Sequence, residues 1–243
     1  MLNYCIIMWK REVIMKILSI DTASNLCTVA ILENTNCIKE LIVNDARNHS
    51  EKIMPLIETI LDETNLNLDD INLIVCDKGP GSFTGIRIGV GTVLAFQDCL
   101  TNIHCVGISS LEALAYNVKN DGIICSLIDA KNENTYFGLF NSTNNTYTQI
   151  GDLSFQNIYD VINLLKQYNN ITFVGDGAIS YKNILESNLS NCSFCDKNDL
   201  SSYSLGIAGY NTYINNINTN TSIMPLYLRK SQAERALEKE GKK

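Results

Sequence analysis

Apolar and polar positions alternate along this chain in a way that predicts two successive copies of one element order. The first copy starts with three short apolar runs that favour strands, separated by polar turns: Lys16–Asp21, Leu26–Leu32 and Cys37–Val43. Short turns between consecutive strands predict an antiparallel meander. Apolar residues then recur at spacings of three and four, and predict a helix from His49 to about Glu63.

The first copy continues with an apolar strand, Ile71–Cys76, that leads into a glycine-rich stretch, Gly79–Gly91. A helical pattern follows this stretch to about Leu100. A fifth strand is predicted at Ile103–Gly107, and Ser109–Glu112 has the residues of a helix start with a capping acid.

The second copy repeats this order from Gly122 onward. We predict a strand ending in an acid at Gly122–Asp129, then a meander around an Asn-rich hairpin at Thr135–Phe140 and Tyr147–Gly151, and a helix at Phe155–Tyr168. A strand at Ile171–Val174, a glycine turn at Gly175–Ala178 and a last helix at Ser201–Asn215 follow. The repeat predicts an α/β fold with two similar lobes, each a mixed sheet flanked by helices. This is the architecture of the actin, sugar-kinase and Hsp70 class, in which a cleft separates the lobes.

The repeat also predicts the domain limits. We expect an unpacked extension over residues 1–14, an N-terminal lobe over 15–118, a C-terminal lobe over 119–229 and a charged tail over 230–243. The extension places its charges after its apolar residues, which is the wrong order for a signal peptide.

Composition narrows the possible functions. The net charge of −7 has the wrong sign for tight, independent binding to nucleic acid, which needs clustered lysine and arginine. The 9 cysteines are scattered and odd in number, as in reduced cytosolic proteins. No run of 18 apolar residues predicts a membrane span. We therefore expect a cytoplasmic protein, and if nucleic acid is involved, we expect a partner to supply most of the positive surface.

Several motifs in their order along the chain closely resemble the TsaB (YeaZ) family. The most specific is Gly79-Pro80-Gly81-Ser82-Phe83-Thr84-Gly85, continued by Arg87, Ile88 and Gly89. Weaker matches span residues 16–229: Ile17–Thr22, His49–Glu51 with Pro55, Gly107–Leu111, Ile128–Ala130, Gly175–Gly177 and Pro225–Arg229. The N-terminal extension and the Asn-rich hairpin depart from the family pattern.

The resemblance implies a non-catalytic scaffold in the bacterial machinery that installs threonylcarbamoyl on the adenosine beside the tRNA anticodon. Members of the family pair with TsaD, the catalytic paralogue, through helices of the N-terminal lobes, and TsaE, a small ATPase, joins the pair. They also form homodimers through the same helical face. The resemblance implies no cofactor of the chain's own and leaves room for ATP or ADP at a composite interface with partners.

The glycine-rich stretch allows three interpretations. Gly85, Gly89 and Gly91 cost a helix roughly 3 kcal/mol, so something must offset that cost. An anion site is disfavoured because the stretch lacks the lysine of a P-loop. Internal packing and docking of a partner's helix remain, and the four-residue spacing suits both. We favour docking, with an interface formed by Gly81, Gly85, Ile86, Arg87, Gly89, Val90 and Val93, together with His49 and Ile53 of the preceding helix.

Two other activities are weighed against the scaffold. A small-molecule kinase or ATPase of the same fold would use Asp21 and Thr22 at the first phosphate turn, with Asp129 and Gly175 in the second lobe. We interpret these residues as degenerate remnants of a nucleotide site and not as a working ATPase. A metallopeptidase is disfavoured because the only two histidines, His49 and His104, cannot form the H-x-x-x-H pair of TsaD.

Overall fold

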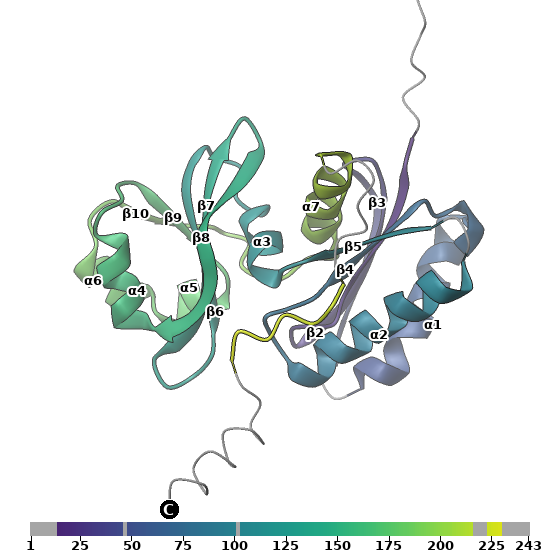
Figure 1. Cartoon of the computed structure of the whole chain (residues 1–243), viewed down its shortest axis with the longest axis horizontal. Helices are drawn as coiled ribbons and strands as arrows, with labels where there is room; N and C mark the ends of the chain where they lie inside the picture. The colour runs from purple at the N-terminus through teal and green to yellow at the C-terminus, as the bar shows by residue number, and fades with distance from the viewer. Residues whose placement is uncertain (1–13, 46–47, 101–102, 216–222, 230–243) are drawn as a thin grey trace, which may run out of the picture.

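The computed structural model describes residues 14–45, 48–100, 103–215 and 223–229, and shows two lobes (Figure 1). Each lobe is built on a five-stranded mixed sheet. The predicted fold class, α/β with two similar lobes flanked by helices, is thus confirmed. The expected extension and charged tail fall almost entirely outside the described residues.

The first sheet has the strand order β3-β2-β1-β4-β5. Its strands are β1 (Lys16–Asp21), β2 (Leu26–Glu33), β3 (Asn36–Asn44), β4 (Leu73–Asp77) and β5 (His104–Ile108). β1 pairs antiparallel with β2 and parallel with β4. The central strands are buried along almost their whole length because helices cover both sides of this sheet.

Two separate cores lie on the two faces of the first sheet. Helices α1 (His49–Glu63) and α2 (Phe83–Cys99) cover one face, and the short 3-10 helix η1 (Leu68–Asp70) leads into β4. Neighbouring strand residues alternate between the cores: Leu18 packs beneath α1 and α2, whereas Ile17 packs on the opposite face.

The second sheet has the order β10-β9-β6-β7-β8. Its strands are β6 (Gly122–Asp129), β7 (Asn134–Thr143), β8 (Thr146–Asn157), β9 (Ile171–Val174) and β10 (Cys192–Phe194). One face is covered by α4 (Ile158–Leu165), α5 (Asp176–Ser180) and α6 (Lys182–Asn188). The third cluster of buried apolar residues lies beneath these helices.

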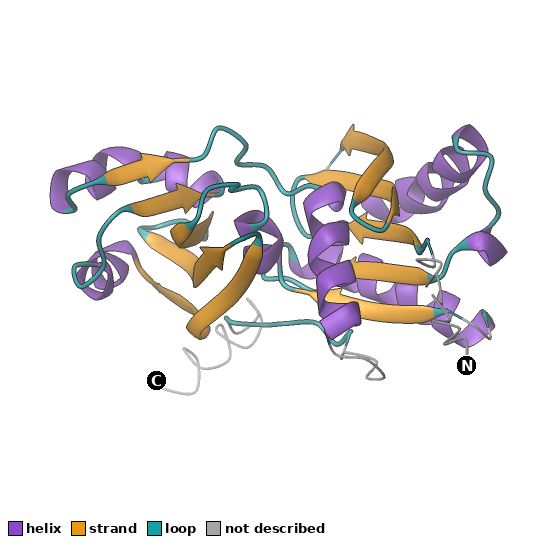
Figure 2. Cartoon of the chain, turned by 90° about the horizontal axis from the view of Figure 1, so that it is seen from above, coloured by secondary structure: helices purple, strands orange, loops and turns teal. Residues whose placement is uncertain are grey.

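Helices α3 (Ser110–Ala115) and α7 (Ser202–Asn215) join the lobes (Figures 1 and 2). α7 comes late in the chain but contacts β1, β2, β4 and β5, so it covers the open face of the first sheet. One buried cluster holds residues of both lobes, among them Leu32, Leu205 and Phe140. A division by residue number at 118/119 therefore does not follow the packing of α7.

Several strand and helix limits differ from the sequence-based expectation, most clearly where β8 meets α4, and one strand is additional. Residues 155–157 end β8 instead of starting α4, because Phe155 pairs with Tyr136 across the sheet and Asn157 caps the helix. β10 was not expected at all; it lies in the Cys192–Cys195 stretch, whose thiols are free. Among the described helices, none combines the length and apolar character needed to cross a membrane.

Candidate functional site

The turn after β1 is closed by its own side chains. Asp21 is buried, and its Oδ1 accepts a hydrogen bond from the backbone N–H of Ala23 at 2.7 Å. The hydroxyl of Thr22 donates to the carbonyl of Gly85 at 2.7 Å. A phosphate would need such backbone N–H groups to be free. The turn therefore holds protein groups in the place where a kinase of this fold would hold phosphate.

The equivalent turn of the second lobe is closed in the same way. Asp129 accepts a hydrogen bond from the backbone N–H of Lys131 at 2.8 Å and forms an ion pair with its ammonium group at 2.6 Å. Although burial opposes it, this pairing with Lys131 leaves the pKa of Asp129 below its ordinary value. Gly175 has a positive φ of 106° and lies against the carbonyl of Leu127, which makes it a structural glycine.

The spaced glycines of α2 face this first turn and not the outside of the molecule. A Cβ built on Gly85 would lie 1.8 Å from the carbonyl oxygen of Thr22. On Gly81 it would lie 2.3 Å from the carbonyl oxygen of Ala23, and on Gly89 2.6 Å from Oγ1 of Thr22. The interpretation that these glycines clear a flank for a partner's helix is wrong, since the chain's own turn fills that flank.

The apolar residues proposed for the same interface are also internal. Ile53, Ile86, Val90 and Val93 are buried in the core beneath α1 and α2. His49 is buried as well, and its Nδ1 lies 3.3 Å from the carbonyl oxygen of Thr22. The Thr22 peptide thus contacts the starts of both helices. Of the predicted interface residues, only Arg87 is classed as exposed.

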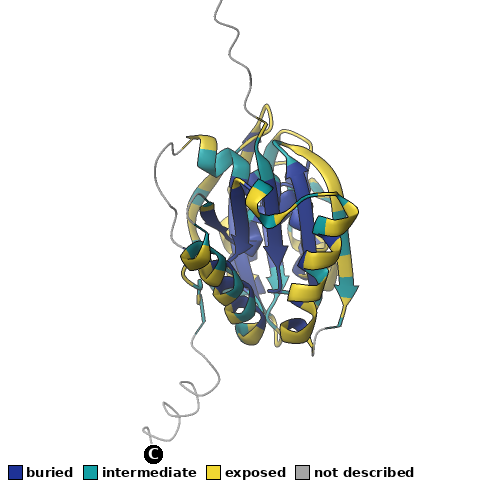
Figure 3. Cartoon of the chain, turned by 90° about the vertical axis from the view of Figure 1, so that its right-hand side faces the viewer, coloured by how far each residue is buried: buried dark blue, intermediate teal, exposed yellow. Residues whose placement is uncertain are grey.

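A different set of residues forms the outer side of α1 and α2. Met54 is 50% exposed and Leu94 is 37% exposed. Gly91 is exposed, and a Cβ built on it would meet nothing within 4 Å. Figure 3 looks at this side of the molecule and shows exposed residues along the outer side of the helices, over buried ones. We call Met54, Arg87, Gly91 and Leu94 the outer face.

Gly91 is the glycine that internal packing does not explain. It lies in the middle of a helix, where glycine costs about 1 kcal/mol relative to alanine. Gly81, Gly85 and Gly89 are forced by close contacts with the β1–β2 turn, but Gly91 has open space around it. The sequence contained this signal, since Gly91 breaks the four-residue spacing of Gly81, Gly85 and Gly89.

A buried carboxyl group on β4 was missed in the sequence. Asp77 ends β4 as Asp21 ends β1, and the two strands are parallel neighbours. Burial raises the pKa of Asp77 to about 6. Burial and the charge of Asp77 raise the pKa of Asp21 well above its ordinary value. A sequence pattern cannot show that the two acids meet, because the strand pairing is non-local.

The segment 223–229 passes from the first lobe to the second. The backbone N–H of Leu226 donates to the carbonyl of Lys78 at 2.7 Å. Tyr227 stacks on Phe83 with ring centroids 4.6 Å apart, and its hydroxyl accepts from Nε of Arg87 at 2.9 Å. At its end, Arg229 lies over the ring of Phe155 in the second lobe, 4.7 Å from the centroid.

Replacing Tyr227 with alanine should loosen this segment. Loss of the ring stack is expected to lower the free energy of unfolding by about 0.5–1.5 kcal/mol, in addition to the energy lost with the buried apolar surface of the ring. Chemical denaturation measures the change. Tyr159→Ala, which removes a tyrosine of similar exposure from α4, serves as the control; an equal or larger loss there would contradict the assigned contacts.

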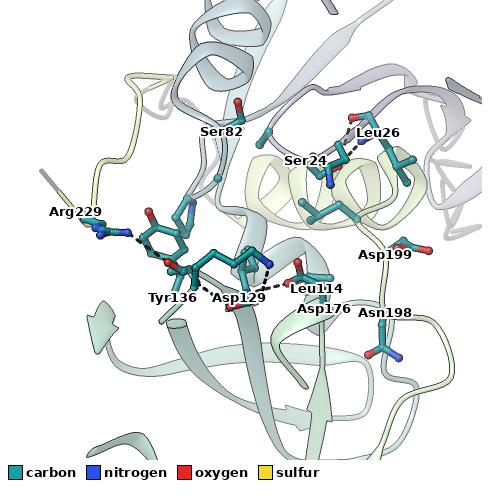
Figure 4. Close-up of a pocket in the computed structure, with 18 of the residues that line it drawn as sticks. Ser24, Leu26, Ser82, Leu114, Asp129, Tyr136, Asp176, Asn198, Asp199 and Arg229 are labelled. Atoms are coloured by element: carbon teal, nitrogen blue, oxygen red, sulfur yellow. Dashed lines mark hydrogen bonds and ion pairs between the residues drawn. The ribbon is translucent and has the colours of Figure 1, made fainter. Parts of the chain in front are cut away.

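A cleft of about 620 Å³ lies between the lobes (Figure 4). Asp129, Asp176 and Arg229 line it, whereas Asp21 and Thr22 do not. Asp176 accepts a hydrogen bond from the backbone N–H of Asp129, so these acids are tied to the protein. Within the described parts of the chain, no group of three metal-binding side chains comes together.

The chain is similar in sequence to known proteins of tRNA threonylcarbamoyladenosine biosynthesis. The family model for TsaD, described as tRNA N6-adenosine threonylcarbamoyltransferase, matches residues 39–237. A curated TsaB protein of Bacillus subtilis is 32% identical over 74% of this chain and 79% of its own length. One of Haemophilus influenzae is 29% identical over 88% and 93%. Both are described as tRNA threonylcarbamoyladenosine biosynthesis proteins.

A solved structure supports the fold. YeaZ from Pseudomonas aeruginosa superposes with a TM-score of 0.71 at 21% identity, over 88% of this chain and all of that one. Sequence and structure comparisons thus agree with the resemblance carried by the glycine-rich stretch. The chain belongs to the TsaB (YeaZ) family and carries the domain that the TsaD family model describes.

Proposed function

We propose that this chain takes part in the biosynthesis of threonylcarbamoyladenosine in tRNA as a non-catalytic scaffold. In this role it binds a TsaD-type catalytic subunit and supports it while that subunit modifies the adenosine next to the anticodon. The single observation that supports this best is Gly91, an exposed helix glycine with open space around it, on a face that also presents Met54 and Leu94. An open glycine lets another backbone approach closely.

The proposed interface is the outer face, defined above by Met54, Arg87, Gly91 and Leu94. It replaces the buried residues that the sequence suggested. α1 and α2 contact each other, so Met54 and Leu94 belong to one two-helix layer. Partly exposed apolar side chains around an open glycine, with an arginine beside them, suit a helix of a partner protein.

The wider assembly is part of the same proposal. A TsaE-type ATPase would join the pair, tRNA would be reached only through the complex, and two copies of the chain would use the outer face when no partner is present. ATP or ADP would bind at a composite interface with partners. The net charge of −7 supports indirect contact with RNA.

Mixing the chain with the TsaD-type subunit of the same organism tests the proposal. Size-exclusion chromatography with light scattering should show a one-to-one complex, and tRNA modification by the reconstituted system should require the chain. Separate elution of the two proteins at micromolar concentration, together with modification that proceeds without the chain, would refute it.

The alternative of a kinase or ATPase has no observation in its favour. Both turns that would hold phosphate are closed by their own aspartates, Asp21 and Asp129. Calorimetry of the isolated chain with ATP and Mg²⁺ should therefore show no binding at millimolar nucleotide. Binding that Asp129→Ala abolishes would restore the alternative, because Asp129 lines the cleft.

A further inference from the structure

Asp21 and Asp77 form a buried carboxyl pair beneath the starts of α1 and α2. They follow directly on paired residues, Ile20 and Cys76, of the parallel strands β1 and β4. Both side chains are almost completely buried, at 1% exposure each. Because the two strands are hydrogen-bonded neighbours, the two carboxyl groups lie side by side, and each affects the pKa of the other. Two carboxyl groups can hydrogen-bond to each other only when one of them carries a proton.

The Oδ1 oxygen of each carboxyl group holds a loop in place through hydrogen bonds. Oδ1 of Asp21 accepts from the N–H of Ala23 at 2.7 Å and closes the β1–β2 turn. Oδ1 of Asp77 accepts from the N–H of Gly79 at 2.6 Å and from the hydroxyl of Ser110 at 2.7 Å. The pair therefore connects the turn beneath α2, the loop that leads into α2, and the start of α3.

The second oxygen of each carboxyl group, Oδ2, has no hydrogen-bond donor from the rest of the described chain. Both Oδ2 atoms are buried. A proton held between these two oxygens would satisfy both, as in other pairs of facing carboxyl groups. Without that proton, two negative charges would face each other in the core.

We propose that this shared proton makes Asp21 and Asp77 a clamp that holds the outer face in its binding-competent shape. The inference rests on the proposed function, and it adds a positioning role for residues that touch no partner. Loss of the proton would push the β1–β2 turn away from the loop at Gly79. The Thr22 peptide would move with the turn, and Thr22 contacts both His49 of α1 and Gly85 of α2.

The charged and titratable groups around the pair do not replace the proton. From the strands, Cys76 and Cys27 are thiols whose pKa values are raised, chiefly by burial, so they stay neutral. Glu40 of β3 adds a negative charge near Asp21, and Lys78 a positive one near Asp77.

Two helices also bring titratable groups near the pair. His49 of α1 is bonded to the Thr22 carbonyl, and Glu112 of α3, whose pKa burial raises to about 7, interacts with Lys78. The raised pKa of Glu112 overlaps the titration of Asp77. Glu112→Gln removes it and separates the two titrations.

The sign of the pH dependence follows from the raised pKa values. A carboxyl group that binds its proton more tightly in the folded protein stabilises the fold most below its unfolded pKa of about 3.9. The contribution of Asp77 is lost as the pH rises from about 3.9 to about 6, where Asp77 ionises in the folded protein. The contribution of Asp21 continues to fall until Asp21 ionises at higher pH, and then stays level.

Asp77→Asn tests the clamp. The new amide keeps an oxygen for Gly79 and Ser110 and donates a hydrogen bond to Asp21, so the variant needs no shared proton. Between pH 4 and pH 7 we expect Tm of the wild type to fall by on the order of 5 °C relative to Tm of Asp77→Asn, because Asp77 ionises in the folded wild type near pH 6. Asp152→Asn, at an exposed carboxyl group of β8, should follow the wild type. An equal pH dependence of Tm in the wild type and Asp77→Asn would overturn the proposal.

Two further measurements keep the test independent of that variant's folding. Carbon-13 NMR of the aspartate carboxyl groups in the wild-type chain should show one buried carboxyl that holds its proton above pH 6; no such step would overturn the clamp. Affinity for the TsaD-type subunit should fall at least about tenfold across the pH at which NMR shows this carboxyl losing its proton, and less in Asp77→Asn. A complex absent at every pH would instead contradict the proposed function, while the NMR step would still establish the shared proton.

Discussion

Gly91→Leu is expected to abolish binding to a TsaD-type partner while leaving the chain folded. A Cβ at position 91 meets nothing within 4 Å, so the leucine can be accommodated by the isolated protein. Removing a glycine from a helix interior should even raise stability by up to about 1 kcal/mol. The added side chain would stand out of the outer face and keep a partner's helix at a distance. Calorimetric titration should show an affinity at least about 100-fold weaker.

A matched control separates this steric effect from a general effect of surface leucine. Asn163→Leu adds the same side chain to an exposed position of α4 in the second lobe. It should bind the partner as the wild type does. If Gly91→Leu stays folded and binds with unchanged affinity, the outer face is not the interface.

Gly85→Ala is expected to destabilise the chain severely. The new Cβ would lie 1.8 Å from the carbonyl oxygen of Thr22 and 3.0 Å from its carbonyl carbon. Both are backbone atoms of a turn that Asp21 also holds, so neither can move cheaply. Overpacking of this kind costs about 3 kcal/mol or more, which in a chain of this length lowers Tm by roughly 6–12 °C.

Thermal denaturation compares Gly85→Ala with Gly91→Ala. The two substitutions are the same chemical change in the same helix, but only position 91 has room for a methyl group. Gly91→Ala should melt at or above the wild-type temperature. A Gly85→Ala protein as stable as Gly91→Ala would show that the turn does not lie against α2 as described.

Local patterns were enough to predict most of the fold. α1, β1, β6 and β9 begin and end where the apolar spacing places them. The repeated order of elements gave the two-lobed architecture, because each copy carries its own strand, meander and helix signals. The return of α7 to the first sheet could not be predicted, since it depends on contacts between residues far apart in the sequence, such as Thr28 and Ser202, which are 174 positions apart.

The candidate site was harder to predict for a physical reason. A four-residue spacing places Gly81, Gly85 and Gly89 on one side of a helix but does not say what lies against that side. Glycine has no apolar side chain that would mark its side as inner or outer. The structure shows that the β1–β2 turn lies there, which left Gly91, the glycine outside the pattern, as the one with open space.

In the proposed function, α1 and α2 have two roles. Their inner side packs on the Thr22 turn and the carboxyl pair beneath it, and their outer side would bind a partner. The turn after β1 would then support a protein-binding face instead of holding phosphate.

Hydroxyl-radical footprinting of the chain, alone and with the TsaD-type subunit, tests this claim most directly. At a concentration at which the free chain is monomeric, Met54 and Leu94 are exposed to the radical, and Tyr159 of α4 provides an internal reference. We expect the complex to lower oxidation of Met54 and Leu94 several-fold and to leave Tyr159 unchanged. Unchanged oxidation of Met54 and Leu94 in a fully formed complex would contradict the account.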